Sequence, residues 1–146
     1  MDAVLMELLP LVRSGHCCSQ LLMHLTLQLQ GTENQPLVES MKGLCHGIGR
    51  SDGPCGLLTG GACALSLLGH KNGAPIQMLE PMLNEYASWF YDRVEGYGGY
   101  DCDNVAQGLN AKKPGDAMPD PVACGALLSE CWGKILELAE SYEIMP

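Results

Sequence analysis

The residues of this chain best suited to chemistry are its cysteines, of which there are eight among 146 residues. No pair has the CxxC spacing, so the common zinc patterns are absent from the sequence. A secreted protein would use such cysteines as disulfide staples, whereas a cytoplasmic protein keeps thiols for metal binding or redox chemistry. The eight are spread over the whole chain, so any site that they form must be assembled by folding; they are Cys17, Cys18, Cys45, Cys55, Cys63, Cys102, Cys124 and Cys131.

Composition and charge narrow the class of protein. The hydrophobic fraction of 47% is typical of a folded chain, and the length predicts one domain spanning residues 1–146. A net charge of −9 argues against nucleic-acid partners and against an anionic membrane surface. The apolar stretch 4–12 is interrupted by Glu7 and Pro10, which is typical of neither a signal peptide nor a membrane span. We therefore expect a cytoplasmic protein with reduced thiols.

Apolar residues recur at helical spacing in most parts of the chain. No window shows the alternation of apolar residues that is typical of a strand, so the sequence predicts an all-α bundle of about five to six helices. Two glycine- and proline-rich stretches, 47–54 and 110–121, are expected to be loops. The apolar stripes lie within 4–12, 21–29, 36–45, 58–68, 79–94 and 127–142.

Three cysteines fall in or just before the first turn of an expected helix. Cys18 and Cys55 each begin an apolar stripe, and Cys102 follows Asp101, a good N-cap residue. Free N–H groups and the positive end of the helix dipole favour a thiolate at such positions. With the inward-facing Cys131 as a fourth, these residues are the candidates for redox chemistry or metal ligation. Cys17 is turned about 100° away from Cys18, toward a flank shared with His24.

A less specific interpretation stays open for all four cysteines, because a buried cysteine also serves as a small hydrophobic residue. His16 and His46 each adjoin a cysteine, but neighbouring residues on a helix point apart, so we expect neither to be its partner. Gly56 and Gly60 sit early in a helix, where glycine costs about 1 kcal/mol relative to alanine. Close helix packing explains these glycines, and a cofactor bound near the backbone is the alternative.

The segment Gly53-Pro-Cys-Gly-Leu-Leu-Thr-Gly60 resembles the CGAxxG element of a redox-active protein family named for its cysteine pattern, C_GCAxxG_C_C. Gly15-His-Cys-Cys-Ser-Gln20 is similar to the N-terminal segment of that family and aligns Cys18, not Cys17. Cys102 and Cys131 match the third and fourth cysteines, with Cys124 as a substitute for Cys131. The sequence departs from the pattern at Leu57, where the family has alanine.

The resemblance implies thiol redox or metal chemistry and no defined substrate. One hypothesis is a thiol oxidoreductase in which Cys18, Cys55, Cys102 and Cys131 form dithiol/disulfide pairs and exchange electrons with a partner protein. A second is a binding protein that holds a soft metal ion or an iron–sulfur cluster with the same thiolates. A third is a helical interaction domain with inert thiols. Members of the family are often encoded near transporter genes, which implies a link to the transport of a metal or oxyanion.

Overall fold

The computed structural model of this protein describes residues 2–146, which form helices joined by turns and loops. No strand forms within that range, where one isolated bridge joins Pro54 to Asp101. The all-α prediction is therefore confirmed for these residues. In chain order the elements are α1 (Ala3–Arg13), α2 (Cys18–Gln30), α3 (Gln35–Ser40), η1 (Met41–Leu44), α4 (Cys45–Arg50), α5 (Gly56–Lys71), α6 (Ile76–Val94), η2 (Glu95–Tyr97), α7 (Cys102–Gly108) and α8 (Gly125–Ser141).

The helix count differs slightly from the five to six expected. Seven of the elements in residues 2–146 are right-handed α-helices, because the short α3 and α7 form helices beside the five long ones. The eighth, α4, is a left-handed turn. Among the described residues, no helix combines the length and apolar character that crossing a bilayer requires.

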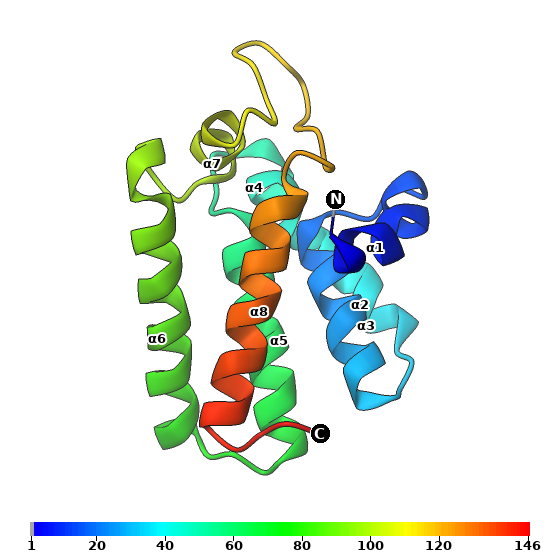
Figure 1. The fold of residues 1–146 in the computed structure, drawn as a ribbon, viewed down its shortest axis with the longest axis vertical. Coiled ribbons are helices and arrows are strands. Elements are labelled where there is room, and N and C mark those ends of the chain that lie inside the picture. The colour runs from blue at the N-terminus through cyan, green and yellow to red at the C-terminus, as the bar shows by residue number, and fades with distance from the viewer. Residues whose placement is uncertain (1) are drawn as a thin grey trace.

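Helix α5 lies at the centre of the packing. It contacts α2 on one side and α6 and α8 on the other, and α1 leans against α8 (Figure 1). The expected apolar stripes form the main core, because the hydrophobic effect drives these side chains away from water. Fully buried members of this core include Leu22, Leu65, Leu68, Met82, Phe90 and Ile135.

Three long helices begin at the same end of the molecule. The N-termini of α2, α5 and α8 all face the end where α7 and α4 lie, whereas α6 runs in the opposite direction (Figure 1). The segment 110–121 contains no helix and extends beyond this end. The cysteines at the helix starts are thereby brought to one end of the bundle.

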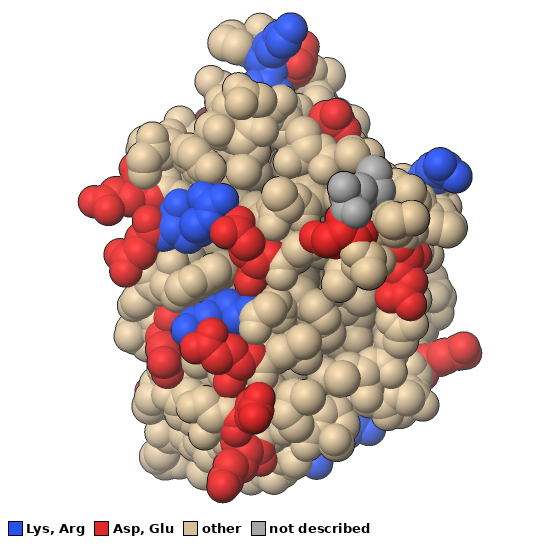
Figure 2. All heavy atoms as spheres, in the orientation of Figure 1, with Lys and Arg blue, Asp and Glu red and all other residues tan. Residues whose placement is uncertain are grey.

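The surface is predominantly acidic, as the net charge of −9 requires. Figure 2 shows acidic side chains spread over the visible face, with a few basic side chains beside them. One such pair joins Arg93 of α6 to Glu130 of α8, with 2.9 Å between Nη2 and Oε2. Exposed pairs of this kind contribute little to stability, so the buried core holds the bundle together.

Glycines allow α2 and α5 to approach closely. A Cβ atom built on Gly60 would lie 2.7 Å from Ser19 Cα, so any side chain there would force the two helices apart. Gly56 lies one turn earlier, where a Cβ would come within 3.5 Å of Ser19 N and 3.7 Å of Cys18 Cβ. The packing of α2 against α5 therefore requires glycine at position 60, whereas the tightest contact of a Cβ on Gly56 would be with Leu44 O of η1, at 3.3 Å.

We expect Gly60→Ala to destabilise the protein, because overpacking costs about 1–3 kcal/mol and outweighs the gain in helix propensity of about 1 kcal/mol. Gly133→Ala is the matched control, since nothing lies within 4 Å of the position a Cβ would take there. That variant should be as stable as the wild type or more so. Urea unfolding monitored by helicity measures both free energies. Equal stability of the two variants would contradict the close approach of α2 and α5.

Candidate functional site

A cavity of about 200 Å³ lies at the end of the bundle where α2, α5 and α8 begin. Eighteen residues from α1, α2, α4, α5, α7 and the segments between them form its walls. Six of the eight cysteines of the chain are among these residues. They are Cys17, Cys18, Cys45, Cys55, Cys102 and Cys124.

Helix starts carry four of these cysteines to the cavity. Cys18 and Cys102 are the first residues of α2 and α7, and Cys55 and Cys124 are the N-cap residues of α5 and α8. The sequence prediction that Cys18, Cys55 and Cys102 open helices is therefore correct. The N-cap position of Cys124 is not evident from the sequence, because the expected apolar stripe begins only at Leu127 and cysteine is not a typical capping residue.

Short backbone contacts hold the starts of α5 and α7 together. Cys55 N donates to Tyr100 O at 2.9 Å, and Cys102 N donates to Gly53 O at 3.1 Å. The Asp101 side chain caps α7 by accepting from Asn104 N at 3.1 Å. These bonds place Cys55 and Cys102 side by side, although 47 positions separate them in the sequence.

A left-handed turn forms one side of the cavity. Residues 46–50 all have positive φ values, between 53° and 66°, so α4 has the opposite hand to a normal helix. Each non-glycine residue in this conformation costs roughly 1–2 kcal/mol, and a β-branched residue such as Ile48 is a rare occupant. We expected a simple loop here; the glycines at 47 and 49 make the left-handed turn attainable.

Two backbone hydrogen bonds hold Gly47 in this turn. Its carbonyl oxygen accepts from Ser51 N at 3.2 Å and from Gly53 N at 3.0 Å. A Cβ on Gly47 would lie 2.6 Å from Gly53 O and 3.0 Å from Cys102 Cβ, so the backbone here touches a cavity thiol residue directly. Strained backbone of this kind is concentrated at functional sites.

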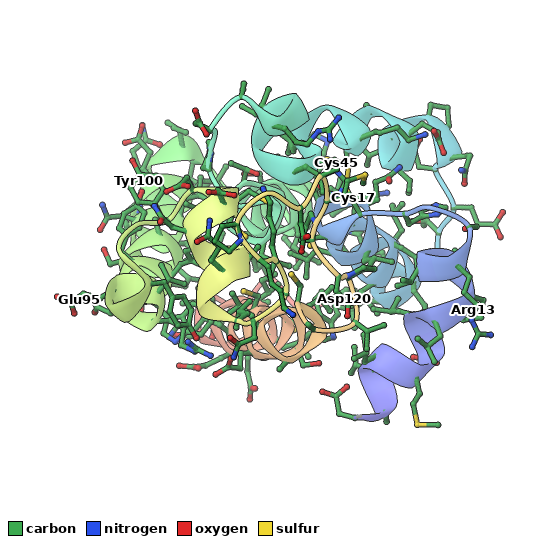
Figure 3. All side chains as sticks on the ribbon, turned by 90° about the horizontal axis from the view of Figure 1, so that it is seen from above. Arg13, Cys17, Cys45, Glu95, Tyr100 and Asp120 are labelled. Carbon is green, nitrogen blue, oxygen red and sulfur yellow. A yellow bond between two sulfur atoms is a disulfide. The ribbon has the colours of Figure 1, made fainter. Side chains whose placement is uncertain are left out.

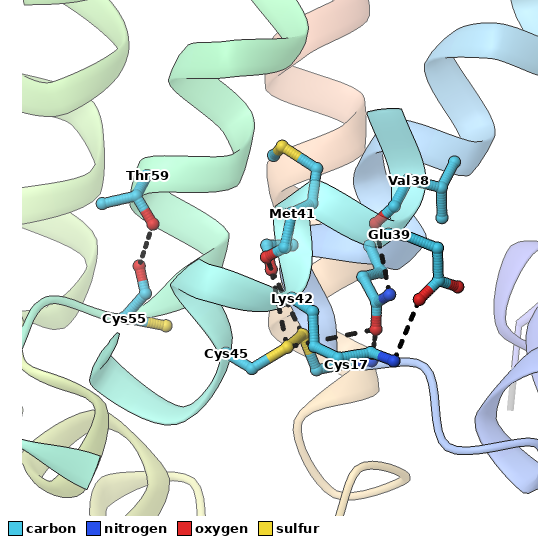
Figure 4. Close-up of a disulfide and its surroundings, with 10 residues drawn as sticks. Cys17, Val38, Glu39, Met41, Lys42, Cys45, Cys55 and Thr59 are labelled. Atoms are coloured by element: carbon cyan, nitrogen blue, oxygen red, sulfur yellow. Dashed lines mark hydrogen bonds and ion pairs between the residues drawn. A yellow bond between two sulfur atoms is a disulfide. The ribbon is translucent and has the colours of Figure 1, made fainter. Parts of the chain in front are cut away.

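Cys17 and Cys45 form a disulfide, with Cα atoms 5.8 Å apart (Figure 4). This finding corrects two expectations: the thiols are not all reduced, and Cys17 is not turned away from the site. Cys17 precedes α2 with an extended backbone, φ −98° and ψ 177°, so helical rotation does not describe its direction. Neither cysteine was among the candidates, because their pairing depends on how α4 folds back onto α2.

Two buried polar side chains surround the disulfide. Ser19 Oγ donates to Met41 O at 2.8 Å and lies 3.2 Å from Cys17 Sγ. Gln20 Oε1 accepts from Cys17 N at 3.1 Å, and Gln20 Nε2 donates to Val38 O at 3.2 Å. Gln20 Oε1 also lies 4.0 Å from Cys45 Sγ. Both sulfur atoms therefore have an oxygen acceptor nearby.

The remaining cysteines are free thiols, and they differ in position. Cys18 packs against the small buried cluster that contains Cys124, and both thiols line the cavity. Cys131, predicted as the fourth site residue, is fully buried in the core beside Tyr86 and does not line the cavity. Cys63 is exposed on α5 and lies outside the cavity.

Raised pKa values keep three free thiols that line the cavity, Cys18, Cys55 and Cys102, protonated at neutral pH. The neighbouring Cys124 thiol and burial both raise the pKa of Cys18, and burial raises the pKa of Cys55. Burial, with a smaller effect of Cys18, raises the pKa of Cys102 to about 11. Burial also raises the pKa of Cys131 to about 12, against an opposing effect of the Tyr86 hydroxyl. The expected preference for thiolates at helix N-termini is therefore outweighed by desolvation.

His16 and His46, the two histidines that adjoin cysteines in the sequence, also line the cavity. Their neighbouring positions in the chain did not predict this. Burial, helped by the nearby Arg50, lowers the pKa of His46, so its imidazole is neutral at neutral pH. His16 Nδ1 lies 3.0 Å from Ser14 Oγ. Across residues 2–146, no group of three histidine, cysteine, aspartate or glutamate side chains is arranged to hold a metal ion.

The two glycines proposed to approach a cofactor have different surroundings. Gly56 lines the cavity, whereas Gly60 packs on Ser19 and does not reach it. On the opposite side, Met118, Pro119 and Pro121 line the cavity from the segment 110–121, which crosses this end of the bundle near the labelled Cys17, Cys45 and Asp120 (Figure 3). The cavity is thus enclosed between helix starts and a loop.

Comparison with known proteins agrees with this cysteine arrangement. The model of a family described as "Putative redox-active protein (C_GCAxxG_C_C)" matches residues 16–138, which contain all eight cysteines. Searches of curated proteins and of solved structures found no match.

The raised pKa of Cys102 predicts an unusual pH profile of alkylation. The rate of its reaction with iodoacetamide should rise about tenfold per pH unit and continue to rise above pH 9, because the thiolate fraction grows until the pH reaches the pKa. A short cysteine peptide, with a pKa of about 8.5, is the control and should level off earlier. Peptide mass mapping of briefly alkylated protein gives the rate. A plateau for Cys102 near pH 9 would show that burial does not control this thiol.

The left-handed turn offers a second test with matched substitutions. Gly47→Ala and Gly49→Ala impose similar strain, because φ is 65° at the first position and 66° at the second. Only the first introduces a clash, since no atom lies within 4 Å of a Cβ at position 49. Gly47→Ala should therefore lose roughly 1–3 kcal/mol more stability and expose Cys102 to faster alkylation. Unfolding curves and peptide mapping measure both effects, and identical behaviour of the variants would contradict this geometry.

Proposed function

The chain belongs to the redox-active C_GCAxxG_C_C family, and from this membership we propose that it is a cytoplasmic thiol redox protein whose cavity cysteines exchange dithiol and disulfide states. One observation carries the proposal: a disulfide and four free thiols line the same cavity. Thiol–disulfide exchange requires a thiolate to reach a disulfide sulfur, so both forms must share one accessible space. The cavity provides that space.

The surroundings of Cys17 and Cys45 suit both oxidation states. In the oxidised form the two sulfur atoms are bonded to each other. In this oxidised structure Ser19 Oγ lies 3.2 Å from Cys17 Sγ and Gln20 Oε1 lies 4.0 Å from Cys45 Sγ, so oxygen acceptors are near both sulfurs for the thiols that reduction would form. Forming two buried thiols costs less free energy when hydrogen-bond acceptors already lie beside them than when their S–H groups have no acceptor. This arrangement favours a reversible pair over a permanent staple.

A second pair consists of free thiols. Cys18 and Cys124 line the same cavity and belong to one packed cluster, and Cys18 follows Cys17 directly in the chain. We propose these two residues, with Cys17 and Cys45, as the exchanging cysteines, and Cys55 and Cys102 as the neighbouring thiols of the same site. A dithiol partner protein is the proposed electron donor.

No observation favours the metal-binding alternative as a second function. The described residues contain no suitable group of three ligands, and Cys131 lies apart from the cavity. Helix packing, moreover, accounts for Gly60 without a cofactor. Metal analysis of protein purified without oxygen accompanies the redox experiment, so that a bound metal would be detected.

We expect Cys17 and Cys45 to titrate together when the protein is equilibrated in dithiol/disulfide buffers of graded potential. Alkylation followed by mass mapping should show one two-electron transition, in which a tenfold change in the redox ratio spans about 30 mV. Cys45→Ser should abolish the transition without loss of helicity. Cys63→Ser is the control and should retain it, because Cys63 lies outside the cavity.

Two results would overturn the proposed function. A Cys17–Cys45 disulfide that resists every buffer, with cavity thiols that never oxidise, would mark a structural staple among inert thiols. Stoichiometric metal in the purified protein, lost together with redox activity in Cys18→Ser, would instead support metal binding.

A further inference from the structure

The walls of the cavity have an unusual composition for this chain. Among the eighteen residues that line the cavity there is no aspartate, glutamate, lysine or arginine, although the chain contains eight basic and 17 acidic residues. The walls consist of sulfur atoms, aliphatic side chains, glycine, proline and two histidines. A charged ligand entering such a space would lose its hydration without gaining a counter-ion, at a large cost in free energy.

Charged side chains near the cavity lie outside it, and their positive and negative charges are equal in number. Arg50, Asp52, Asp103 and Lys112 line a shallow depression that adjoins the cavity at His46 and Cys102. Two of them, Lys112 and Asp103, form an ion pair with 2.6 Å between Nζ and Oδ1. Equal numbers of positive and negative groups give this depression no net preference for a charged ligand.

The volume of the cavity limits the size of an occupant. A protein cavity of about 150 Å³ accommodates benzene, so a space of about 200 Å³ holds a molecule only slightly larger than benzene. Glutathione disulfide, a peptide dimer with several charged groups, exceeds this limit in both size and charge.

Resting on the proposed function, we propose that the cavity is the substrate site for a small, uncharged organic disulfide, which the Cys18–Cys124 dithiol reduces. Both thiols line the cavity, and Cys18 packs against the buried cluster to which Cys124 belongs. The same walls already contain a disulfide, so the site suits the geometry of exchange.

The reaction needs no other reactant for one turnover. The sulfur of one thiol, after losing its proton, attacks one sulfur of R–S–S–R, which breaks that bond and releases the first R–S⁻. The second thiol attacks the mixed disulfide, forms the Cys18–Cys124 bond and releases the second R–S⁻. The two protons lost by the cysteines convert both products to R–SH. Two electrons thus pass from the cysteine sulfurs to the substrate.

A series of disulfides that differ in charge tests this proposal. Reduced protein is exposed to bis(2-hydroxyethyl) disulfide, which is uncharged, to cystamine, which carries two positive charges, and to dithiodiacetate, which carries two negative charges. Each rate is divided by the rate of the same reagent with a free small thiol. We expect Cys18 and Cys124 to oxidise about tenfold faster, on this scale, with the uncharged reagent, since burial of charge is costly.

Cys63 provides the control within the same molecule. It is exposed on α5 and does not line the cavity, so its normalised rates should be similar for all three reagents. A second measurement uses Ala106→Met, because Ala106 is buried and lines the cavity. The longer side chain should slow the oxidation of Cys18 and Cys124 by the uncharged reagent and leave Cys63 unchanged.

The outcomes separate the substrate class from the proposed function. Equal normalised rates at Cys18 and Cys124 for all three reagents would overturn the uncharged substrate and leave the redox function intact. If Ala106→Met folds and the oxidation rates of Cys18 and Cys124 are unchanged, the cavity is not the substrate site. If that variant does not fold, the three reagents of different charge decide the question by themselves. Cavity thiols that react with none of the reagents and in no redox buffer would refute the redox function itself.

Discussion

The contact between α2 and α5 is the constraint on which the rest of the structure depends. Gly56 and Gly60 present bare backbone to Ser19, and any side chain at position 60 would push the helices apart. Because both helices begin at the same end, their close approach brings Cys18 to the start of α5, where a Cβ on Gly56 would lie 3.7 Å from Cys18 Cβ. Ser19, fully buried in this contact, also bonds to Met41 O and lies beside the disulfide. One small-residue interface therefore supports both the main core and the cysteine cavity.

The site illustrates a competition between two electrostatic effects. Four helices begin at the cavity with a cysteine in the N-cap or first position, where the helix dipole favours negative charge. Burial acts in the opposite direction and prevails, since the pKa values of Cys18, Cys55 and Cys102 are raised. Such thiols stay neutral until a reaction removes their protons. A neutral, apolar cavity is consistent with this protonation state and with the neutral imidazole of His46.

Much of the fold could be predicted from the sequence, because buried helix faces leave a regular apolar pattern. The stripes at 58–68, 79–94 and 127–142 correspond to the buried faces of α5, α6 and α8. The helix-start positions of Cys18, Cys55 and Cys102 could also be predicted. The disulfide could not, because it depends on the tertiary position of Cys45 before a left-handed turn. The position of Cys131 away from the cavity likewise depends on how α8 is aligned lengthwise against α5, which periodicity does not determine.

The disulfide also divides the protein into parts of unequal stability. It closes a loop of 28 residues containing α2, α3 and η1, and in a chain-entropy model such a cross-link stabilises the fold by about 3–4 kcal/mol. Met23, Leu27, Val38 and Met41 form a small core of their own, separate from the main one. Without the cross-link, the segment that carries α3 and η1 would depend on this small core and on the hydrogen bonds of Ser19 and Gln20. Reduction of the disulfide should then increase local unfolding of α3 and η1, which amide hydrogen exchange measures. The oxidation state of the cavity would in this way change the order of a surface segment.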